Sequence, residues 1–352
     1  MTDTPVALRI GPYSRLVRPR RAASLLGLAA LLVMAIAMSL AVGSAGMPLE
    51  RVVAALLGVG DDMDRLIVME FRLPRALQAI EAGACLAVAG LLLQRSTRNP
   101  LASPDVLGVV DGAALGVVLF LVLFSGADDA LTVSIHWQPV AATFGGVAFL
   151  ALLFALAREQ AGQPIRLLLF GVALAALAKA ATTLFLILGP IQRASQVFHW
   201  LAGSVHTATW EEVAIVAAMA APLLLLAGAM ARRLDLLDLD QATSRSFGLR
   251  TMLIQSAAIL LAAALTAVAV SFVGGIGFVG LIAPHLVRLL VGRGGGGGLL
   301  GAAMAGALMV VTADLAVRLL FAPLEVPTGA ATAVVGAPYL LYLLTRRTHA
   351  DG

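Results

Sequence analysis

Several ionisable residues lie inside long apolar stretches of this sequence, and five of them are candidates for chemistry. They are Glu81, Asp111, Lys179, His285 and Asp314. Charged side chains within a membrane are rare, and they generally mark ion pathways, proton relays or buried ion pairs. One interpretation is therefore an ion-coupled secondary transporter, in which the four residues other than Lys179 would be coupling groups near broken helices.

The same sequence offers little for catalysis. Lys179 is the only lysine in the chain, and it follows Leu177 and Ala178 in the middle of an apolar stretch. A P-loop needs a glycine-rich turn before its lysine to hold phosphate, so this chain cannot hydrolyse ATP by that route. The apolar stretches also lack a paired nucleophile and base or a cluster of metal ligands. We therefore expect a transport protein with no catalytic residues, metal or cofactor of its own.

The elements that must position these residues are membrane helices. Hydrophobic residues make up 60% of the chain, charged residues only 12%, and the mean hydropathy is +0.97. Soluble domains carry about a quarter charged residues, so this composition predicts a polytopic membrane protein. A span needs about twenty apolar residues. Ten candidate spans follow, and they predict an all-α fold: 23–42, 73–94, 104–124, 139–157, 166–188, 211–230, 251–272, 276–291, 299–320 and 329–345.

The arginines orient these spans. All the basic residues except Lys179 are arginines, and most of them fall on inner segments if the N-terminus is inside. Positive residues favour the cytoplasmic side of short loops, so both termini are predicted to be cytoplasmic. Because the arginines are scattered over short loops with no aromatic platform, we expect a lipid bilayer as partner and no nucleic acid.

The predicted organisation has three parts. They are a basic N-terminal arm over residues 1–22, a ten-helix domain over 23–345 whose longest inner loop is 232–250, and a tail over 346–352. The first apolar stretch has the flanks of a signal peptide, but it is longer than the usual 7–15 apolar residues, so we expect an uncleaved helix.

Two segments predict particular structures. Gly108, Gly112 and Gly116 form a GxxxGxxxG ridge on the third span, which predicts the close approach of another helix. The loop 232–250 is typical of a short amphipathic helix closed by Gly248. By itself, the short helix in the loop 232–250 is most simply interpreted as a linker between two spans.

Several motifs, in order, carry a family resemblance. They are Arg72-Leu73-Pro74-Arg75 with Gly83, Gly90 and Gln94; Arg98-Asn99-Pro100-Leu101-Ala102-Ser103-Pro104; Gly274 to Gly280 with Ala283-Pro284-His285 and Arg288; Asp314 with Arg318; and Leu324-Glu325-Val326-Pro327-Thr328-Gly329. From about Arg72 onward, this pattern closely resembles the permease subunits of iron-siderophore, haem and cobalamin ABC importers. The resemblance implies a ten-helix permease of the cell inner membrane. It would pair with a second permease copy or relative, two cytoplasmic ATPases that bind ATP and Mg²⁺, and an extracytoplasmic binding protein.

The resemblance also implies roles for particular residues. The inner loop would present a coupling helix to the ATPase through Ala242, Ser244, Arg245, Ser246, Phe247, Gly248 and Leu249. On the outer face, the arginines that would receive acidic residues of the binding protein are Arg72, Arg75 and Arg318. The alternative is a snorkelling role at a helix end or, for Arg318, a pair with Asp314 one turn back. Packing and helix-shaping positions are Asn99, Pro100, Gly280, Pro284 and His285, and we favour this role for His285 over a haem ligand or proton relay.

Glu81 and Lys179 depart from the small or apolar residues usual in that family. Glu81 lies nine residues after Arg72, and Lys179 lies nine residues before Leu188. At 1.5 Å per residue, both lie roughly 13 Å below the outer boundary, on helices that run in opposite directions. Opposite charges at equal depth reduce each other's burial cost. The sequence therefore predicts either a buried ion pair, which we favour, or two charges that line the pathway.

These motifs leave the cargo open. Ferric siderophores, haem and cobalamin are all large, and the binding protein that conveys them supplies most of the specificity. A ferric siderophore is the default expectation from family frequency. Transport that requires a separate ATPase and no ion gradient would distinguish this function from the ion-coupled alternative.

Overall fold

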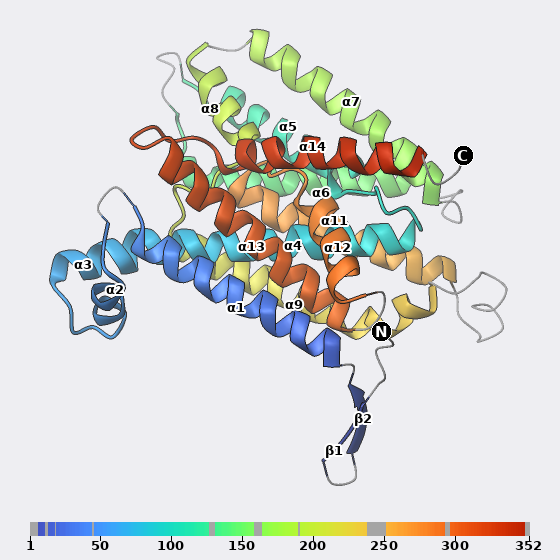
Figure 1. Ribbon diagram of the computed structural model, residues 1–352. Helices are drawn as coiled ribbons and strands as arrows, with labels where there is room; N and C mark the ends of the chain where they lie inside the picture. The colour runs from blue at the N-terminus through green and yellow to red at the C-terminus, as the bar shows by residue number, and fades with distance from the viewer. Residues whose placement is uncertain are drawn as a thin grey trace.

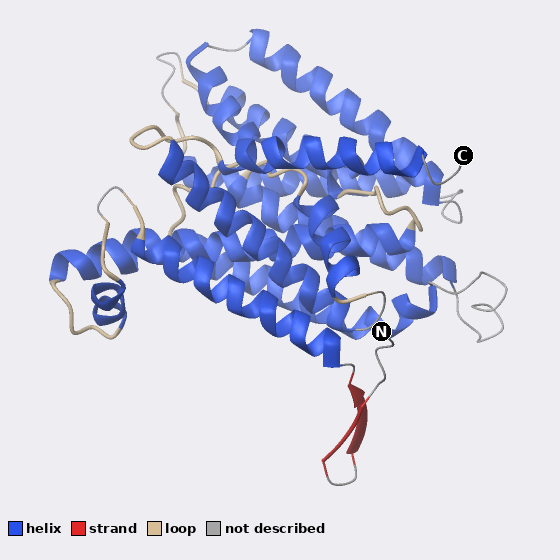
Figure 2. Cartoon of the chain, viewed as in Figure 1, coloured by secondary structure: helices blue, strands red, loops and turns tan. Residues whose placement is uncertain are grey.

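The computed structural model describes residues 6–10, 13–17, 19–43, 46–126, 131–157, 164–188, 191–237, 251–292 and 296–348. Each of the ten predicted spans coincides with a helix (Figure 1, Figure 2). These helices are α1 (Pro19–Ala41), α4 (Leu73–Ser96), α5 (Val109–Leu123), α6 (Gln138–Ala157), α7 (Pro164–Leu188), α9 (Trp210–Leu237), α11 (Thr251–Val273), α12 (Val279–Leu290), α13 (Gly296–Leu320) and α14 (Thr328–Thr348). The apolar runs therefore predicted where helices form and in what order.

The helices differ in whether they are long enough to cross a bilayer. Among the described residues, seven helical segments are long and apolar enough, while α5, α12 and the apolar part of α14 (Thr328–Leu343) are shorter. At 1.5 Å per residue, the 12 residues of α12 extend about 18 Å, which is less than a hydrocarbon core. The number of helices that span the membrane therefore stays a prediction.

Two of the short helices begin later than predicted for a local reason. Gly108 (φ 73°) and Phe278 (φ 67°) adopt the left-handed conformation immediately before α5 and α12. Such residues do not continue a right-handed helix, so the helices begin at Val109 and Val279. The prediction that Gly108 belongs to a helical glycine ridge is therefore corrected: it precedes the helix, and only Gly112 and Gly116 lie within α5.

The described chain is nearly all helical, with one exception to the predicted all-α class. β1 (Val6–Ile10) and β2 (Tyr13–Val17) form an antiparallel hairpin within the N-terminal arm, with Ile10 paired to Tyr13. The alternation of Val6, Leu8 and Ile10 with smaller or polar residues is the sequence signal for this strand. The short helices α2 (Leu49–Leu56), α3 (Asp62–Leu66) and α8 (Ile191–Ala202) lie in predicted outer segments, and a π-helical segment (Ile67–Arg72) joins α3 to α4.

The core of the bundle forms around α4 and α11, which are the most buried of the long helices. α4 packs against α13, α11, α12 and α9. Glycines permit its closest contacts, since a Cβ at Gly83 would overlap the carbonyl of Gly306 in α13, and one at Gly90 would overlap that of Gly280 in α12. This close packing of α4 against α13 fixes the positions of the charged residues nearer their outer ends.

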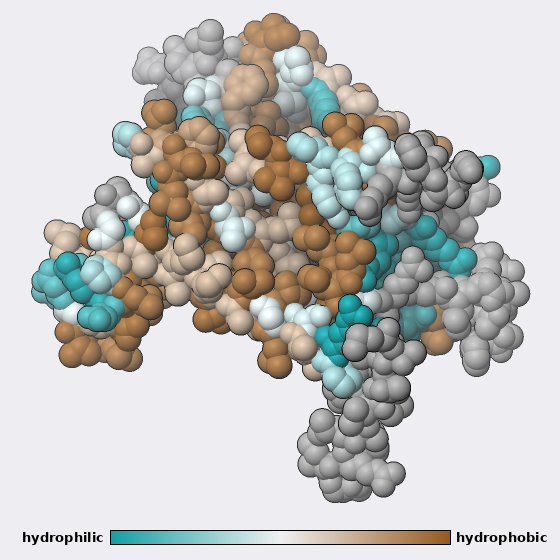
Figure 3. Space-filling view, viewed as in Figure 1, coloured by the Kyte–Doolittle hydropathy of each residue, from teal (hydrophilic) through white to brown (hydrophobic). Residues whose placement is uncertain are grey.

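The two ends of the bundle can be told apart. Figure 1 places the first turn of α1 and the last turn of α14 at one end, and α2 and α3 at the other. In Figure 3, apolar residues cover the helices between the ends, and hydrophilic residues gather near α2 and α3 and at the opposite end. This distribution fits a multi-pass membrane protein. Following the arginine-based topology, we call the end that carries α2 and α3 the outer end.

Candidate functional site

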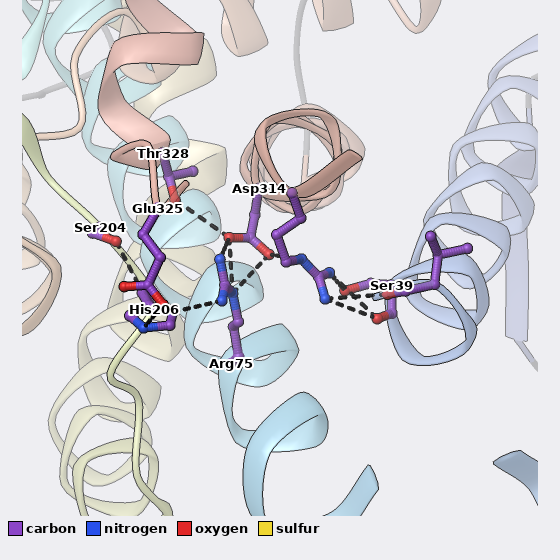
Figure 4. Close-up of polar contacts among 9 residues, drawn as sticks. Ser39, Arg75, Ser204, His206, Asp314, Glu325 and Thr328 are labelled. Carbon is purple, nitrogen blue, oxygen red and sulfur yellow. Dashed lines mark hydrogen bonds and ion pairs between the residues drawn. The ribbon is translucent and has the colours of Figure 1, made fainter. Parts of the chain in front are cut away.

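A group of charged contacts centres on Asp314, near the outer end of α13. The Asp314 carboxylate is 2% exposed, and Arg75 from the first turn of α4 donates to its Oδ1 from Nη2 at 2.7 Å and from Nε at 3.0 Å (Figure 4). Arg318, one turn further along α13, places its Nε 3.1 Å from Oδ2 of Asp314. This is the i,i+4 pair that the sequence offered as the alternative role of Arg318. Two guanidinium groups therefore share one buried carboxylate.

The same cluster joins four helices. Arg318 Nη2 donates to Oγ of Ser39 at 2.6 Å, which links α13 to the end of α1. Thr328, the first residue of α14, donates its hydroxyl to Oδ1 of Asp314 at 3.4 Å. Since Arg75 comes from α4, the Asp314 carboxylate joins the ends of α4, α13 and α14, and Arg318 connects them to α1. We call Arg75, Asp314 and Arg318, with their neighbours His206 and Glu325, the outer charge cluster.

His206 and Glu325 extend the cluster toward the surface. Nη1 of Arg75 lies 2.8 Å from Nδ1 of His206, and Nε2 of His206 lies 2.6 Å from Oε1 of Glu325. A guanidinium only donates hydrogen bonds, so this geometry assigns the ring proton to Nε2, where it faces Glu325. The pKa of His206 is lowered from its ordinary value, first by burial and next by the charge of Arg75, while Glu325 opposes this shift. A neutral His206 therefore bridges an arginine and a carboxylate.

The outer charge cluster borders a cavity of about 750 Å³. Its walls come from the 3₁₀ turn Ile135–Trp137, the start of α6, α8, the segments 203–209 and 322–327, and the outer ends of α11 and α13. The polar and charged side chains of these walls are Arg75, His136, Gln138, Gln196, His199, Ser204, His206, Thr207, Thr209, Glu212, Ser271, Arg318 and Glu325. A space of this size holds a small organic ligand, and its polar wall offers both donors and acceptors.

Arg72 does not join the other two predicted docking arginines. It is 7% exposed, and its Nη1 donates to the carbonyl oxygens of Leu40 at 2.6 Å and Ala41 at 3.0 Å. These are among the last carbonyls of α1, which have no partner within their own helix. The guanidinium of Arg72 therefore caps α1 inside the protein, and its predicted docking role stays a prediction.

The predicted ion pair between Glu81 and Lys179 is not formed. Lys179 Nζ instead lies 3.7 Å from Oδ1 of Asp111 in α5, and Oε2 of Glu81 is buried without a hydrogen-bond partner among the described residues. The physical reason is helix placement. Glu81 lies on α4 in the core, whereas α7, which carries Lys179, packs mainly against α5, α6 and the 3₁₀ turn Pro104–Leu107.

The predicted packing residues occupy close contacts. In α5, Gly112 lies against the ring of Phe149, and Gly116 lies against Ala141 and Gly145, all of them in α6. In α12, a Cβ at Gly280 would come within 2.5 Å of Cδ of Pro104, and Pro284 is buried in the helix.

His285 and Asn99 make local contacts of a structural kind. The ring of His285 meets Tyr339 of α14 edge-on at a centroid distance of 5.9 Å, and its Nδ1 lies 3.5 Å from Nη2 of Arg288. Asn99 Oδ1 accepts from the backbone N–H of Leu101 at 3.0 Å, which holds the turn that contains Pro100. These contacts suit the helix-shaping roles that the family resemblance implies.

The predicted ATPase-coupling residues cannot be placed. Ala242, Ser244, Arg245, Ser246, Phe247, Gly248 and Leu249 all lie outside the described residues. Their role stays a prediction.

Sequence reasoning missed the part that His206 plays in the outer charge cluster. His206 has no distinguishing neighbours in the chain, so no sequence signal marked it. Glu325 had such a signal, because it stands in one of the motifs that carry the family resemblance, but no role was assigned to it. Both residues lie in segments between helices. Only the folding of the whole bundle brings His206 to Arg75 and Glu325 to His206.

Comparisons with known proteins agree on one family. Residues 31–346 match the model of the FecCD transport family. The chain is 42% identical over 320 residues to the "Probable siderophore transport system permease protein YfhA" of Bacillus subtilis, covering 91% of this chain and 92% of the relative. It is 41% identical over 280 residues to the "Fe(3+) dicitrate transport system permease protein FecD" of Escherichia coli, covering 80% and 85%.

A solved structure also matches nearly the whole chain. It is described as "An inward-facing conformation of a putative metal-chelate type ABC transporter", with a TM-score of 0.79 and 28% identity. The match covers 92% of this chain and 99% of that one.

Proposed function

Since this chain belongs to the FecCD transport family, as a permease subunit of an ABC importer for iron chelates, we propose that its cargo is a ferric siderophore. The observation that supports this cargo is the high identity to the siderophore permease relative from Bacillus subtilis. The chain is a multi-pass membrane protein, and we place it in the cell inner membrane with both termini cytoplasmic. An extracytoplasmic binding protein delivers the chelate, and two ATPase subunits drive its passage through this permease and a second copy or relative.

Reconstitution tests this proposal. The permease is placed in proteoliposomes with the cognate ATPase and binding protein, and uptake of radiolabelled ferric siderophore, ferric citrate and haem is measured. We expect uptake of the siderophore that needs ATP and the ATPase and that persists when ionophores collapse ion gradients. Uptake that instead follows an ion gradient without the ATPase would establish the secondary-transporter alternative. Preference for haem or citrate would retain the importer and change the cargo.

The outer charge cluster supports a docking proposal that differs from the sequence prediction. Arg75 and Arg318 have side chains 13% and 15% exposed and border the outer cavity, so partner carboxylates can reach them there. Exposed charge pairs mainly set orientation and association rate, and they weaken with salt. We assign docking of the binding protein to Arg75 and Arg318, and a structural role to Arg72.

Docking is measured as the affinity of the purified binding protein for the reconstituted permease at several salt concentrations. Arg75→Gln and Arg318→Gln are expected to weaken binding and reduce its salt dependence. Arg51→Gln is the matched control, because Arg51 is an outer arginine with a 57% exposed side chain that is already paired with Asp64. An equal effect of all three substitutions would contradict the assignment.

Coupling to the ATPase is assigned to the inner loop. A short helix that ends at a glycine is a rigid element that can insert into a groove of a partner protein. We expect Gly248→Leu to leave docking of the binding protein intact and to uncouple ATP hydrolysis from uptake. Unchanged stimulation of the ATPase together with unchanged transport would refute the role of this loop.

A further inference from the structure

The short helix α2 is held against the outer end of α1. The chain turns sharply after α1, because the backbone N–H of Met47 donates to the carbonyl oxygen of Ala41 at 3.0 Å, and α2 begins two residues later. The buried residues of α2 are Val52 and Ala55, and they belong to one apolar cluster with Leu40 of the last turn of α1. α2 therefore lies at the level of the last turn of α1.

This level is the outer boundary of the bilayer. Val68, in the π-helical segment that leads into α4, belongs to the same apolar cluster. The carbonyl oxygen of the next residue, Met69, accepts a hydrogen bond from Nε1 of Trp210, the first residue of α9, at 2.8 Å. Tryptophan is enriched at membrane–water interfaces, where its ring meets lipid and its N–H meets a polar partner. The residues that pack against α2 thus lie beside an interfacial tryptophan.

The apolar side of α2 is wider than the part that the bundle covers. Leu49, Val53 and Leu56 follow the i, i+4, i+7 spacing of one helix face, and they are 54%, 46% and 41% exposed. At about 100° per residue, this face adjoins the buried stripe of the helix, whereas Glu50 and Arg51 lie on the other side. We call Leu49, Val53 and Leu56 the α2 face. It is an exposed apolar surface at the boundary of the bilayer.

The α2 face continues the lipid-facing surface of α1. α1 is long and apolar enough to span a bilayer, and Leu31, Met34 and Met38 form an exposed stripe along it that reaches toward its outer end. Figure 1 places α2 beside the outer end of α1, and Figure 3 shows apolar residues on the lower side of the extension that carries α2 and α3. An apolar surface that runs from a span onto an amphipathic helix at the boundary is typical of a helix that lies in the interface.

We propose that α2 is an interfacial anchor, and that the α2 face inserts among the phospholipids of the outer leaflet while Glu50 and Arg51 face water. Lipid is favoured over a protein partner because the α2 face carries no charge to recognise one and because it continues a surface that the bilayer covers. The π-helical segment that contacts α2 leads into α4. The anchor therefore fixes the outer end of α4, and with it Arg75, relative to the membrane surface.

Spin-label accessibility tests the anchor in the permease reconstituted with its ATPase in proteoliposomes. Cys85 is the only cysteine in the chain and is buried, so single cysteines are introduced in a Cys85→Ala background. Spin labels at Val53→Cys and Leu56→Cys are compared with one at Glu50→Cys, the matched control on the other side of the same helix. Each label is probed with molecular oxygen, which concentrates in lipid, and with a nickel chelate, which stays in water.

We expect the ratio of oxygen to nickel accessibility to be several times higher at positions 53 and 56 than at position 50. Leu31→Cys in α1 supplies the reference value for lipid. Only labelled variants whose melting temperature in detergent equals that of Cys85→Ala are compared, and Leu49→Cys replaces one that unfolds. The comparison does not depend on the cargo, so failure of siderophore uptake would leave the anchor standing.

Two results would overturn the anchor. Nickel accessibility at positions 53 and 56 as high as at position 50 would mean that the α2 face lies in water. If adding the purified binding protein then removed this accessibility, the α2 face would be a docking surface for that protein instead. Low accessibility to both oxygen and nickel, without the binding protein, would mean that another copy of the permease covers the α2 face.

Discussion

Charged residues at the outer end of the bundle and in the middle of the membrane are arranged in opposite ways. In the outer charge cluster, Arg75 and Arg318 share Asp314 at short distances, and the carboxylate is almost fully buried. In mid-membrane, Lys179 lies 3.7 Å from Asp111 with its ammonium group largely exposed. A buried ion pair is strongly destabilised when one partner is removed, whereas an exposed pair contributes little. The outer charge cluster therefore holds helices together, whereas the pair between Lys179 and Asp111 contributes little to stability.

The largest expected effect comes from breaking the outer charge cluster. Asp314→Asn leaves two guanidinium groups without their counter-charge, and loss of one partner of a buried pair costs about 3–5 kcal/mol. We expect a large fall in melting temperature of the purified permease in detergent. Glu325→Gln is the matched control, since Glu325 belongs to the same cluster but its side chain is 66% exposed. Similar losses for the two variants would contradict the structural role of Asp314.

The next effect comes from the helix contact that brings Arg75 to Asp314. A Cβ at Gly83 would overlap the carbonyl of Gly306, so Gly83→Ala should push α4 away from α13. Overpacking of this kind costs about 1–3 kcal/mol. Gly228→Ala in α9 is the control, because a Cβ there meets nothing within 4 Å. Melting temperature in detergent is the measurement, and a harmless Gly83→Ala would mean that this contact does not position the cluster.

A smaller effect concerns pH. Burial and Arg75 lower the pKa of His206, with Arg318 acting in the same direction, while Glu325 and Asp314 oppose them. Below its ordinary pKa of about 6.5, the unfolded chain binds a proton that the folded protein resists. Stability contributed by neutral His206 is therefore lost as pH falls through that value toward the lower folded pKa, and it is retained above it.

The pH effect is measured as melting temperature in detergent between pH 7.5 and pH 5.5. Because His206 is partly exposed, the loss should stay below about 1 kcal/mol. The melting temperature of His206→Gln should change less over this pH range than that of the wild type. A variant with the same pH dependence as wild type would show that other groups cause it.

The smallest effects concern the mid-membrane charges. Double-mutant cycles with neutral substitutions measure how much two residues stabilise each other in the permease in detergent. Between Asp111 and Lys179 the coupling energy should be about 0.5 kcal/mol, as for an exposed pair. Between Glu81 and Lys179 the effects should add to within about 0.5 kcal/mol, because they do not contact each other. A coupling energy between Glu81 and Lys179 that is larger than the one between Asp111 and Lys179 would support the ion pair that the sequence predicted.

The failure of the predicted Glu81–Lys179 pair shows what an estimate of membrane depth from helix length can and cannot predict. The rise of 1.5 Å per residue placed Glu81 and Lys179 at equal depth, and nothing in the structure changes that estimate. It gave no information on which helices are neighbours or on which side of its helix each residue lies. The same limit applies to Arg72, whose outer-end position was predicted, but whose contact with the carbonyls of Leu40 and Ala41 depends on how α1 packs beside it.

The amino-acid sequence by itself determined the membrane class, the positions of ten helices and their order, because long apolar runs must form helices in a bilayer. Its arginines predicted a common side for both termini, and its motifs indicated the family. Only the tertiary structure decided that Arg75 and Arg318 share Asp314, that His206 joins them to Glu325, and that Lys179 faces Asp111. These contacts join segments far apart in the chain. Helix period and length fix a residue's depth, but only the packing of whole helices, here set by glycines such as Gly83 against Gly306, decides which side chains meet.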